Sequence, residues 1–418
     1  MALPIHGTPA IDLVAQLTDI GGNDRDWKSG RAFSLAYYAG PEPYDVGRHA
    51  HDMFLGTNGL NTDVFPSLRY MQNGVLSAVA NLQHGGDTAA GVMTSGGTES
   101  ILCAVLGARE MFRTTHPHIT APEMVLSTSA HAAFSKASHY FDVKMIRVTV
   151  GGDFRADVAA MRAAVTSNTI LIVGSAPSYP QGVIDPIVEI ATIALEHNIL
   201  CHVDACMGGF TLPFLEQLGE QIPLWDFRVP GVTSISADVH KYGYSAKGAS
   251  VLMYSNKQIR KNQFFATTDW LGGFYASQSM AGTRPGGPIA AAWAVMQHLG
   301  VDGYQHHARR AFDAAQKLAA SINKIEGLTV WGTPQATLVG WGADPNASVP
   351  VDIFAVGDEL ARRDWFCDRQ TPPDSLHCSV NSVHGDVINE FISDISSSVE
   401  ATRGAQASNR SAQYGTLE

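Results

Sequence analysis

Residues 234–248 read SISADVHKYGYSAKG, and this stretch decides the fold. Its first four residues are small or apolar and predict a short buried strand. The strand ends in a turn that carries Lys241, with Gly243 two positions later. A lysine after a strand is usually a solvated surface residue, so its meaning depends on what surrounds this stretch in the sequence.

Outward from this stretch, short apolar runs alternate with amphipathic segments from about residue 70 to 300. The predicted strands are 124–127, 144–148, 170–173, 199–203, 234–237 and 250–254. They are short and apolar, as strands covered on both faces should be. Helical patterns lie between them, for example 157–165 and 186–197. This alternation predicts an α/β domain with a mostly parallel sheet.

The chain has 418 residues, more than one hydrophobic core usually serves. We expect an irregular N-terminal arm over residues 1–65, a large domain over 66–300 and a smaller α+β domain over 301–418. In the last part, 309–325 and 386–402 read as helices, and 328–331 and 335–340 read as strands. The polar tail from residue 404 is expected to be mobile.

The composition limits the class of partner. A net charge of −11 argues against a surface that binds nucleic acid. No apolar run approaches the roughly 20 residues of a membrane span, and the N-terminus lacks a signal-peptide pattern. The five cysteines have no CxxC spacing, which favours reduced thiols in the cytoplasm over disulfides or a metal site.

A glycine-rich helix start precedes the lysine. Residues 94–100 read TSGGTES and lead into an apolar helical pattern, so the free N–H groups at Gly97 and Thr98 could hold a phosphate. The spacing lacks the GxxxxGK[ST] pattern of a nucleotide P-loop. Alone, such a start is weak evidence for an anion site.

Two side chains complete the pattern. His131 follows a predicted strand; it could be a packed core residue, or its flat ring could stack on a cofactor. Asp204 ends another strand; it could cap a turn, or it could pair with a protonated pyridine nitrogen. All these elements occur in order at strand ends, where open α/β sheets bind ligands. We therefore predict pyridoxal 5′-phosphate (PLP) on Lys241.

Six motifs carry a family resemblance: TSGGTESILCA, SAHAAFSKAS, PQGVIDPI, HVDACMGGF, TSISADVHKYGYSAKG and AGTRPGG. They resemble the sphingosine-1-phosphate lyases, within the fold-type I, PLP-dependent group II decarboxylase-like superfamily. The resemblance runs from about residue 29 to about 300 and continues more weakly beyond. It implies a homodimer with active sites at the subunit interface. It also implies retro-aldol cleavage of a phosphorylated long-chain base to a fatty aldehyde and phosphoethanolamine.

The resemblance also implies roles for single residues. For the cofactor these are a Schiff-base lysine (Lys241), a pyridinium partner (Asp204), a ring stacker (His131), phosphate contacts (Gly97, Thr98, His240) and contacts from the partner subunit (Gly282, Thr283). Lys247 would contact the substrate phosphate or assist proton transfer, and Tyr38 would be an active-site tyrosine. Either of these two could take the proton from the substrate hydroxyl. Arg284 lies in the same loop as the partner contacts.

One position departs from the family pattern. Residues 58–66 read NGLNTDVFP, whereas the family generally reads N-x-L-H-P-D-x-F-P. Asn61 can donate a hydrogen bond to substrate but cannot carry the charge of histidine. This favours a rival hypothesis, an amino-acid decarboxylase in which Arg284 binds a substrate carboxylate. A third hypothesis is a PLP-binding regulatory or scaffold protein without activity.

Overall fold

The structure is a computed structural model that describes residues 2–416. Its centre is a seven-stranded sheet in the order β1-β7-β6-β5-β4-β2-β3. The strands are β1 (Ala90–Thr94), β2 (Glu123–Ser127), β3 (Lys144–Val148), β4 (Thr169–Ser175), β5 (Leu200–Asp204), β6 (Ser234–Ala237) and β7 (Ser250–Tyr254). β7 runs antiparallel to both of its neighbours, and the other pairings are parallel. The predicted α/β fold class is confirmed.

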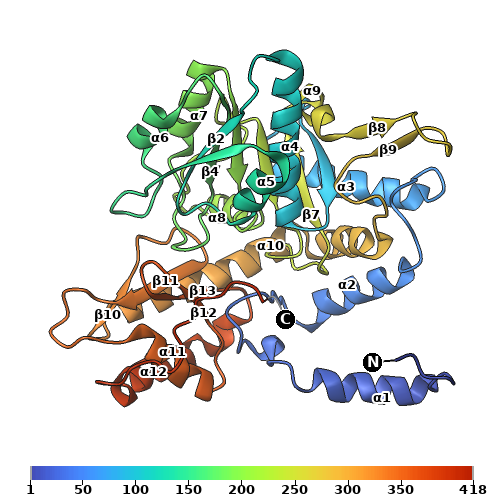
Figure 1. Cartoon of the computed structure of the whole chain (residues 1–418). Coiled ribbons are helices and arrows are strands. Elements are labelled where there is room, and N and C mark those ends of the chain that lie inside the picture. Colours follow the sequence, from blue (N-terminus) through green and yellow to red (C-terminus); the bar gives the residue numbers. More distant parts are fainter. Residues whose placement is uncertain (1, 417–418) are drawn as a thin grey trace.

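Helices cover the sheet on both faces (Figure 1). They are α3 (Pro66–Leu82), α4 (Gly97–Thr115), α5 (Ala133–Phe141), α6 (Val158–Ala164), α7 (Ile187–His197), α8 (Leu212–Gln217) and α9 (Lys257–Arg260). Strands β1, β2, β4, β5 and β7 are buried along their whole length, which explains why they read as apolar runs without alternation. β1, β2, β4, β5 and β6 point the same way, so their carboxyl ends meet at one edge of the sheet.

Strand β1 was not predicted from the sequence. Its five residues, AGVMT, include Gly91, which weakens a strand pattern. The structure explains this glycine: a Cβ atom there would lie 2.2 Å from the sulfur of Met253 on β7. The close approach of two strands, rather than a turn, requires the glycine.

A smaller domain follows with its own sheet and core. The sheet has the order β10-β11-β13-β12, with β10 (Leu328–Val330), β11 (Leu338–Ala343), β12 (Asp368–Gln370) and β13 (Ser375–Ser379) all antiparallel. Helices α11 (Ile353–Arg362) and α12 (His384–Ala401) pack on it around a separate core that includes Trp341, Phe354 and Phe391. The boundaries at residues 65 and 300 remain predictions.

Helix α10 (Gly286–Ile322) connects the two domains and kinks at Gly300, where φ is 55°. Gly286 and Gly287 begin α10, so the loop of Gly282, Thr283 and Arg284 ends directly at a helix start. A Cβ atom on Gly286 would lie 1.9 Å from Oγ1 of Thr57. Packing against the arm therefore requires this glycine.

The N-terminal arm is more regular than expected. It contains α1 (Ala10–Gly21), η1 (Trp27–Ser29) and α2 (Pro41–Met53). Pro41 occupies the first helical turn of α2, a position that suits proline. Helix α2 runs along α10, whereas α1 lies apart from the sheet domain and has no buried residue (Figure 1).

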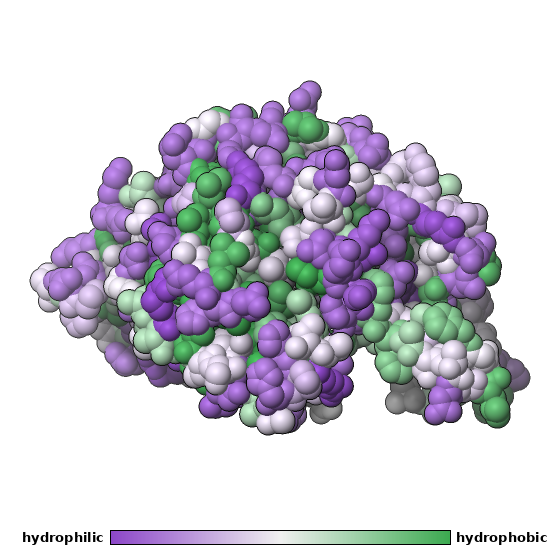
Figure 2. All heavy atoms as spheres, turned by 90° about the horizontal axis from the view of Figure 1, so that it is seen from above, coloured by the Kyte–Doolittle hydropathy of each residue, from purple (hydrophilic) through white to green (hydrophobic). Residues whose placement is uncertain are grey.

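The surface seen from above is mostly polar, with apolar side chains in scattered patches (Figure 2). A hairpin of β8 (Phe265–Thr267) and β9 (Tyr275–Ser277) extends from the large domain (Figure 1). Four of its apolar side chains are more than half exposed: Phe265, Trp270, Leu271 and Phe274. Within residues 2–416, every helix is too short or too polar to cross a bilayer.

Candidate active site

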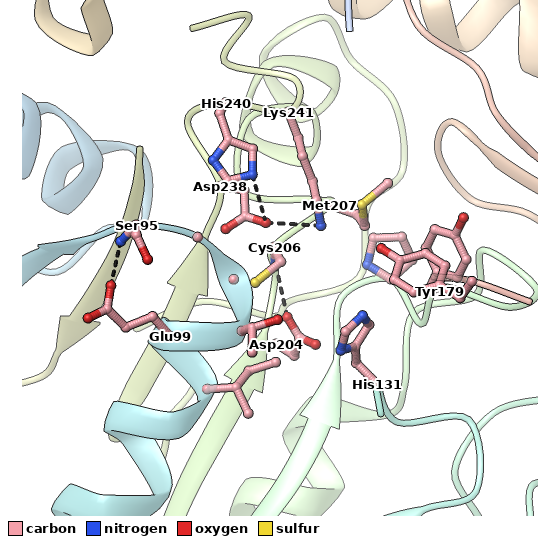
Figure 3. Close-up of a pocket in the computed structure, with 16 residues that line it drawn as sticks. Ser95, Glu99, His131, Tyr179, Asp204, Cys206, Met207, Asp238, His240 and Lys241 are labelled. Atoms are coloured by element: carbon pink, nitrogen blue, oxygen red, sulfur yellow. Dashed lines mark hydrogen bonds and ion pairs between the residues drawn. The ribbon is translucent and has the colours of Figure 1, made fainter. Parts of the chain in front are cut away.

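A cavity of about 340 Å³ lies at the carboxyl ends of the parallel strands. Its lining residues come from the loops after β1, β2, β4, β5 and β6, and from the C-terminal tail (Figure 3). They are Ser95, Gly96, Gly97, Thr98, Glu99, Ile101, His131, Pro177, Tyr179, Asp204, Cys206, Met207, Asp238, His240, Lys241 and Tyr414. The six cofactor contacts predicted within one subunit are thus gathered around one space.

Lys241 follows β6 and points into this cavity (Figure 3). Its Nζ atom lies 2.9 Å from Oδ2 of Asp238. Burial disfavours the charge of Lys241, but the Asp238 carboxylate, together with the nearby Cys206, Tyr37 and Tyr414, raises the pKa of Lys241. Burial by itself would raise the pKa of Asp238, but the charge of Lys241 helps to lower the pKa of that carboxyl below its usual value. The pair keeps the lysine oriented at the cavity floor.

Asp204 is the last residue of β5 and is 8% exposed. Its Oδ1 atom accepts hydrogen bonds from the amide of Cys206 and the hydroxyl of Ser236, both at 3.1 Å. These donors fix the carboxylate while it faces the cavity. A ring nitrogen with a proton would find an oriented acceptor here.

His131 lies opposite, in the loop after β2. Its Nδ1 atom accepts a hydrogen bond from the amide of Ala133 at 3.1 Å, so in the neutral ring the proton sits on Nε2. Burial lowers the pKa of His131, and the charge of Asp204 offsets this only in part. A neutral, oriented imidazole suits the predicted stacking on an aromatic cofactor.

The glycine-rich start of α4 forms one wall. A Cβ atom on Gly97 would lie 2.7 Å from both Oδ2 of Asp238 and Sγ of Cys206, so the backbone comes closer here than any other residue would allow. The first amides of α4 have no partner within the helix and favour an anion. The Ser95 amide is already bonded to Glu99, at 2.6 Å.

Two buried polar atoms in this cavity have no partner among the described residues: Oδ1 of Asp238 and Nδ1 of His240. Buried polar atoms are rarely left unpaired, so these point to a bound group. An aromatic aldehyde with a phosphate would meet the amine of Lys241, the carboxylate of Asp204, a flat imidazole and a helix N-terminus. The residues present fit PLP.

A second cavity of about 600 Å³ adjoins the first, and the two share His240. Lys247 lines it, donates to the carbonyl of His240 at 3.3 Å, and lies 4.8 Å from the ring centre of Tyr37. Although the amine is open to this cavity, burial within its walls, followed by the charge of Lys241, lowers the pKa of Lys247 to about 8. This lysine can therefore exchange a proton near neutral pH.

Tyr37, not the predicted Tyr38, lies at the junction of the cavities. Its hydroxyl contacts the sulfur of Met207 at 3.7 Å, and Met207 lines the first cavity. Burial raises the pKa of Tyr37, so its phenol stays protonated. The Tyr38 ring packs edge-on against Trp27 at 5.8 Å and Tyr44 at 5.9 Å. Sequence spacing alone did not separate these adjacent tyrosines.

The predicted loop residues lie outside the two cavities. Arg284 donates to Oε1 of Gln72 at 2.7 Å and to the carbonyl of Gly59. Thr283 accepts from Asn58 at 3.3 Å, and Gly282 packs near the hydroxyl of Tyr275.

Asn61 also lies outside the two cavities. It is exposed, and its side chain accepts from the amide of Asp63 at 3.0 Å. Its contact with substrate stays a prediction.

The sequence analysis missed several lining residues, among them Asp238, Tyr179 and Tyr414. Asp238 stands three positions before the lysine, a spacing that could have suggested an ion pair. Tyr179 comes from the loop after β4 and donates to Asp368 of the small domain at 2.6 Å. Tyr414 belongs to the tail that was expected to be mobile, and no local signal marks it.

Comparison with known proteins agrees with this site. Residues 52–342 match the pyridoxal-dependent decarboxylase conserved domain. The chain is 42% identical over 414 residues to the sphingosine-1-phosphate lyase of Oryza sativa subsp. japonica, covering 96% of this chain and 76% of that protein.

Solved structures agree as well. The sphingosine-1-phosphate lyase of Burkholderia pseudomallei matches with a TM-score of 0.92 and 37% identity, over 97% of this chain and 93% of that chain. Glutamate decarboxylase of Lactobacillus brevis has a TM-score of 0.85 over 97% of this chain and 96% of its own, but at 21% identity it shows the fold alone. These matches confirm PLP as the cofactor. The chain belongs to the pyridoxal-dependent decarboxylase family, in its sphingosine-1-phosphate lyase branch.

Proposed function

We propose that this protein cleaves the C2–C3 bond of a phosphorylated long-chain base, such as sphingosine 1-phosphate, to a fatty aldehyde and phosphoethanolamine. The observation that carries the proposal is the pair of adjoining cavities. One holds the lysine, carboxylate and imidazole that fit PLP, and the other is lined by Lys247, whose amine could pair with a substrate headgroup. Two of the proteins named above, from Oryza sativa and Burkholderia pseudomallei, are sphingosine-1-phosphate lyases, which supports this substrate class.

When bound, PLP supplies an electron sink for the carbon next to the substrate nitrogen. Lys241 would hold the cofactor covalently, Asp204 would keep a proton on the ring nitrogen, and neutral His131 would cover the ring. The helix start at Gly97 and Thr98, together with His240, would bind the cofactor phosphate. These roles are consistent with the positions of the side chains around the first cavity.

The second cavity would receive the substrate headgroup. Arg48 and His51 line this cavity together with Lys247, and Asp52 lines it as well. Below pH 8 the Lys247 amine is mostly charged and can pair with phosphate; its neutral form can accept the proton of the 3-hydroxyl. Tyr37 lies beside the same amine and can relay that proton. We assign the base role to the Lys247–Tyr37 pair instead of Tyr38.

A second copy of the chain would complete the site. The loop of Gly282 and Thr283 is anchored beside α4, because the amide of Met280 donates to Glu99 at 2.9 Å. The loop also packs on the β8–β9 hairpin, whose exposed apolar side chains suit a dimer interface. In exchanged mixtures, Lys241→Ala and Arg284→Ala subunits should recover activity, since one hybrid site keeps both Lys241 and the loop that Arg284 holds in place. If dimers that are verified to have exchanged subunits recover no activity, a shared site is contradicted.

The decarboxylase alternative has less support. That hypothesis requires Arg284 to bind a substrate carboxylate, but the Arg284 guanidinium already donates hydrogen bonds to Gln72 and to the carbonyl of Gly59. The cytoplasmic location stays a prediction; the five cysteines are free thiols in the described residues.

An aldehyde assay on sphingosine 1-phosphate, beside a carbon dioxide assay on common amino acids, tests the function. Aldehyde release supports the proposal, and carbon dioxide release without aldehyde rejects it.

A further inference from the structure

The C-terminal tail returns from the small domain to the cofactor cavity. Helix α12 ends at Ala401, and Tyr414 lines the same cavity as Lys241. The Tyr414 ring packs edge-on against His131 and Tyr179, with ring centres 5.5 Å and 5.1 Å apart. Since 46% of Tyr414 is exposed, the ring stands between the cavity and solvent.

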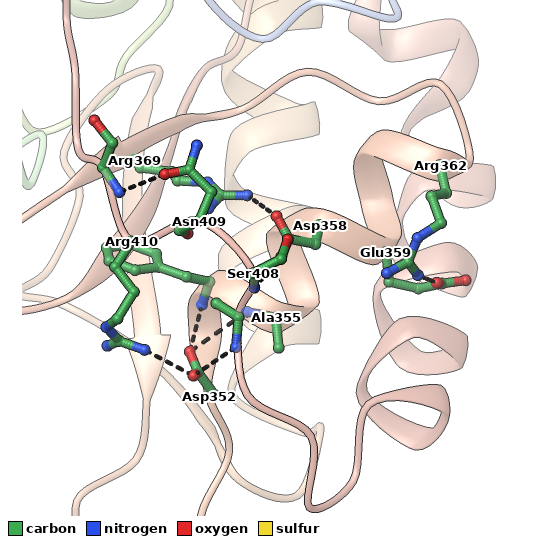
Figure 4. A network of polar contacts seen from close by, with 12 residues as sticks. Asp352, Ala355, Asp358, Glu359, Arg362, Arg369, Ser408, Asn409 and Arg410 are labelled. Carbon is green, nitrogen blue, oxygen red and sulfur yellow. Dashed lines mark hydrogen bonds and ion pairs between the residues drawn. The ribbon is translucent and has the colours of Figure 1, made fainter.

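Arg410 fastens this tail to the small domain (Figure 4). Its guanidinium donates to Asp352 at 2.8 Å and to Asp374 at 2.6 Å. Asp352 is itself fixed, because it is the N-cap of α11 and accepts from the amides of Phe354 and Ala355. The same carboxylate also accepts from the amide of Ala407 at 3.1 Å. One aspartate, whose side chain is 7% exposed, thus holds both a helix start and the tail.

A second set of contacts lies beside the first (Figure 4). Asp358 accepts from the amide and the hydroxyl of Ser408, at 3.0 Å and 2.9 Å. Arg369 bridges Asp358, at 2.5 Å, and the backbone carbonyl of Asn409. The tail is therefore held through its backbone as well as through Arg410, which specifies one path over the surface.

The anchor lies close enough to control the tyrosine. Four peptide steps separate Arg410 from Tyr414, which allows a reach of about 14 Å at most. Ala412, between them, packs against the core of the small domain. Arg410 and Ala412 together therefore limit where the ring of Tyr414 can lie.

We propose that residues 407–414 form a strap that closes the cofactor cavity with Tyr414, and that Arg410 is the positioning residue that keeps the strap shut. The closed strap shields the cofactor and the reacting carbon from water. Opening it gives small molecules access past His131. This role holds for any amine substrate and does not depend on the proposed lyase reaction.

The test uses the holoenzyme and needs no turnover. Hydrogen exchange of the amides in residues 405–412 reports the anchor, and the rate at which hydroxylamine removes bound PLP reports shielding. Arg410→Ala should speed both by roughly threefold to tenfold, as expected for a lost, partly exposed charge-assisted contact. Tyr414→Ala should speed only the hydroxylamine reaction. Arg410→Lys, which keeps one charge, should fall between wild type and Arg410→Ala.

Arg403→Ala is the matched control, because Arg403 pairs with Glu400 at the end of α12 and lies before the strap. It should change neither measurement. The double variant Arg410→Ala/Tyr414→Ala should react with hydroxylamine no faster than the faster single variant, since both act on one closure. The strap proposal would be overturned if the two substitutions had additive effects on the hydroxylamine rate. It would also be overturned if either single variant lost PLP to hydroxylamine at the wild-type rate. If Arg410→Ala fails to fold, Asp374→Asn removes one contact and gives the same decision.

Discussion

The two adjoining cavities differ in how their walls are made. The walls of the first cavity, which fits the cofactor, come mainly from turns at the carboxyl ends of strands. The second cavity, which contains Lys247, is lined mainly by the N-terminal arm, including α2. Strand ends are fixed by the sheet, so Asp204, His131 and Lys241 could be placed from sequence order. The arm is placed by packing between distant segments, and there Tyr37, not the predicted Tyr38, lies at the junction of the cavities. Topology predicts a site more reliably than local spacing.

The largest effect is expected at the floor of the cofactor cavity. Lys241→Ala should abolish covalent attachment of PLP, because no other amine faces Asp204 and Asp238 in the described residues. Wild-type protein reduced with borohydride and then denatured should carry the cofactor mass, and the variant should not. A variant that retains this mass would show that another residue holds the cofactor.

Asp204→Ala should lower kcat by at least about a hundredfold, because a pyridine ring without its proton is a much poorer electron sink. The competing explanation, that Asp204 only caps a turn, predicts a loss of about 1 kcal/mol of stability with turnover intact. Measuring PLP occupancy, Tm and kcat on the same sample separates the two. Normal turnover with a lowered Tm would support the cap.

The adjacent residues Tyr37 and Tyr38 test how the arm contributes to the second cavity. Tyr37→Phe should lower kcat/KM about tenfold, because its hydroxyl lies at the junction of the cavities and a hydrogen bond to a charged group contributes roughly 1.5–3 kcal/mol. Tyr38→Phe is the matched control and should stay within about twofold of wild type, since only its ring packs. A larger loss of kcat/KM in Tyr38→Phe would instead support the sequence-based prediction that Tyr38 is the active-site tyrosine.

The pH dependence of binding follows from Lys247. Its pKa is lowered to about 8 by burial and by Lys241, so the amine is charged below pH 8 and neutral above. KM for a phosphorylated base should therefore rise as pH passes about 8, as the free enzyme loses this charge. Lys247→Arg should remove that rise, because arginine stays charged. The same rise in Lys247→Arg would assign it to another group.

The smallest effect is expected at Asn61. Its side chain is exposed and bonded to Asp63 within the chain, so Asn61→His should change KM less than about threefold, the scale of a surface contact. Comparing KM at pH 6 and pH 8 checks for a contribution from charged histidine. A tenfold drop at pH 6 would mean that position 61 reaches a headgroup, as the family pattern implies.

Much of the fold was predictable because buried strands read as apolar runs. The strands around β2 to β7 matched within a few residues, whereas β1 was hidden by Gly91. The small domain was harder, since β12 has only three residues and carries Asp368 and Arg369. Tyr414 was not predictable at all: its place depends on Arg410 meeting Asp352 and Asp374, contacts across 58 and 36 positions in sequence.

The most direct test of the two-cavity account is kcat/KM for sphingosine 1-phosphate and for sphingosine without the phosphate, in wild type and in Lys247→Ala. The account predicts that wild type prefers the phosphorylated base by at least about tenfold, the scale of one charge-assisted hydrogen bond. Lys247→Ala should lose most of that preference through KM, with PLP still bound. An equal preference in wild type and variant would contradict a headgroup cavity at Lys247.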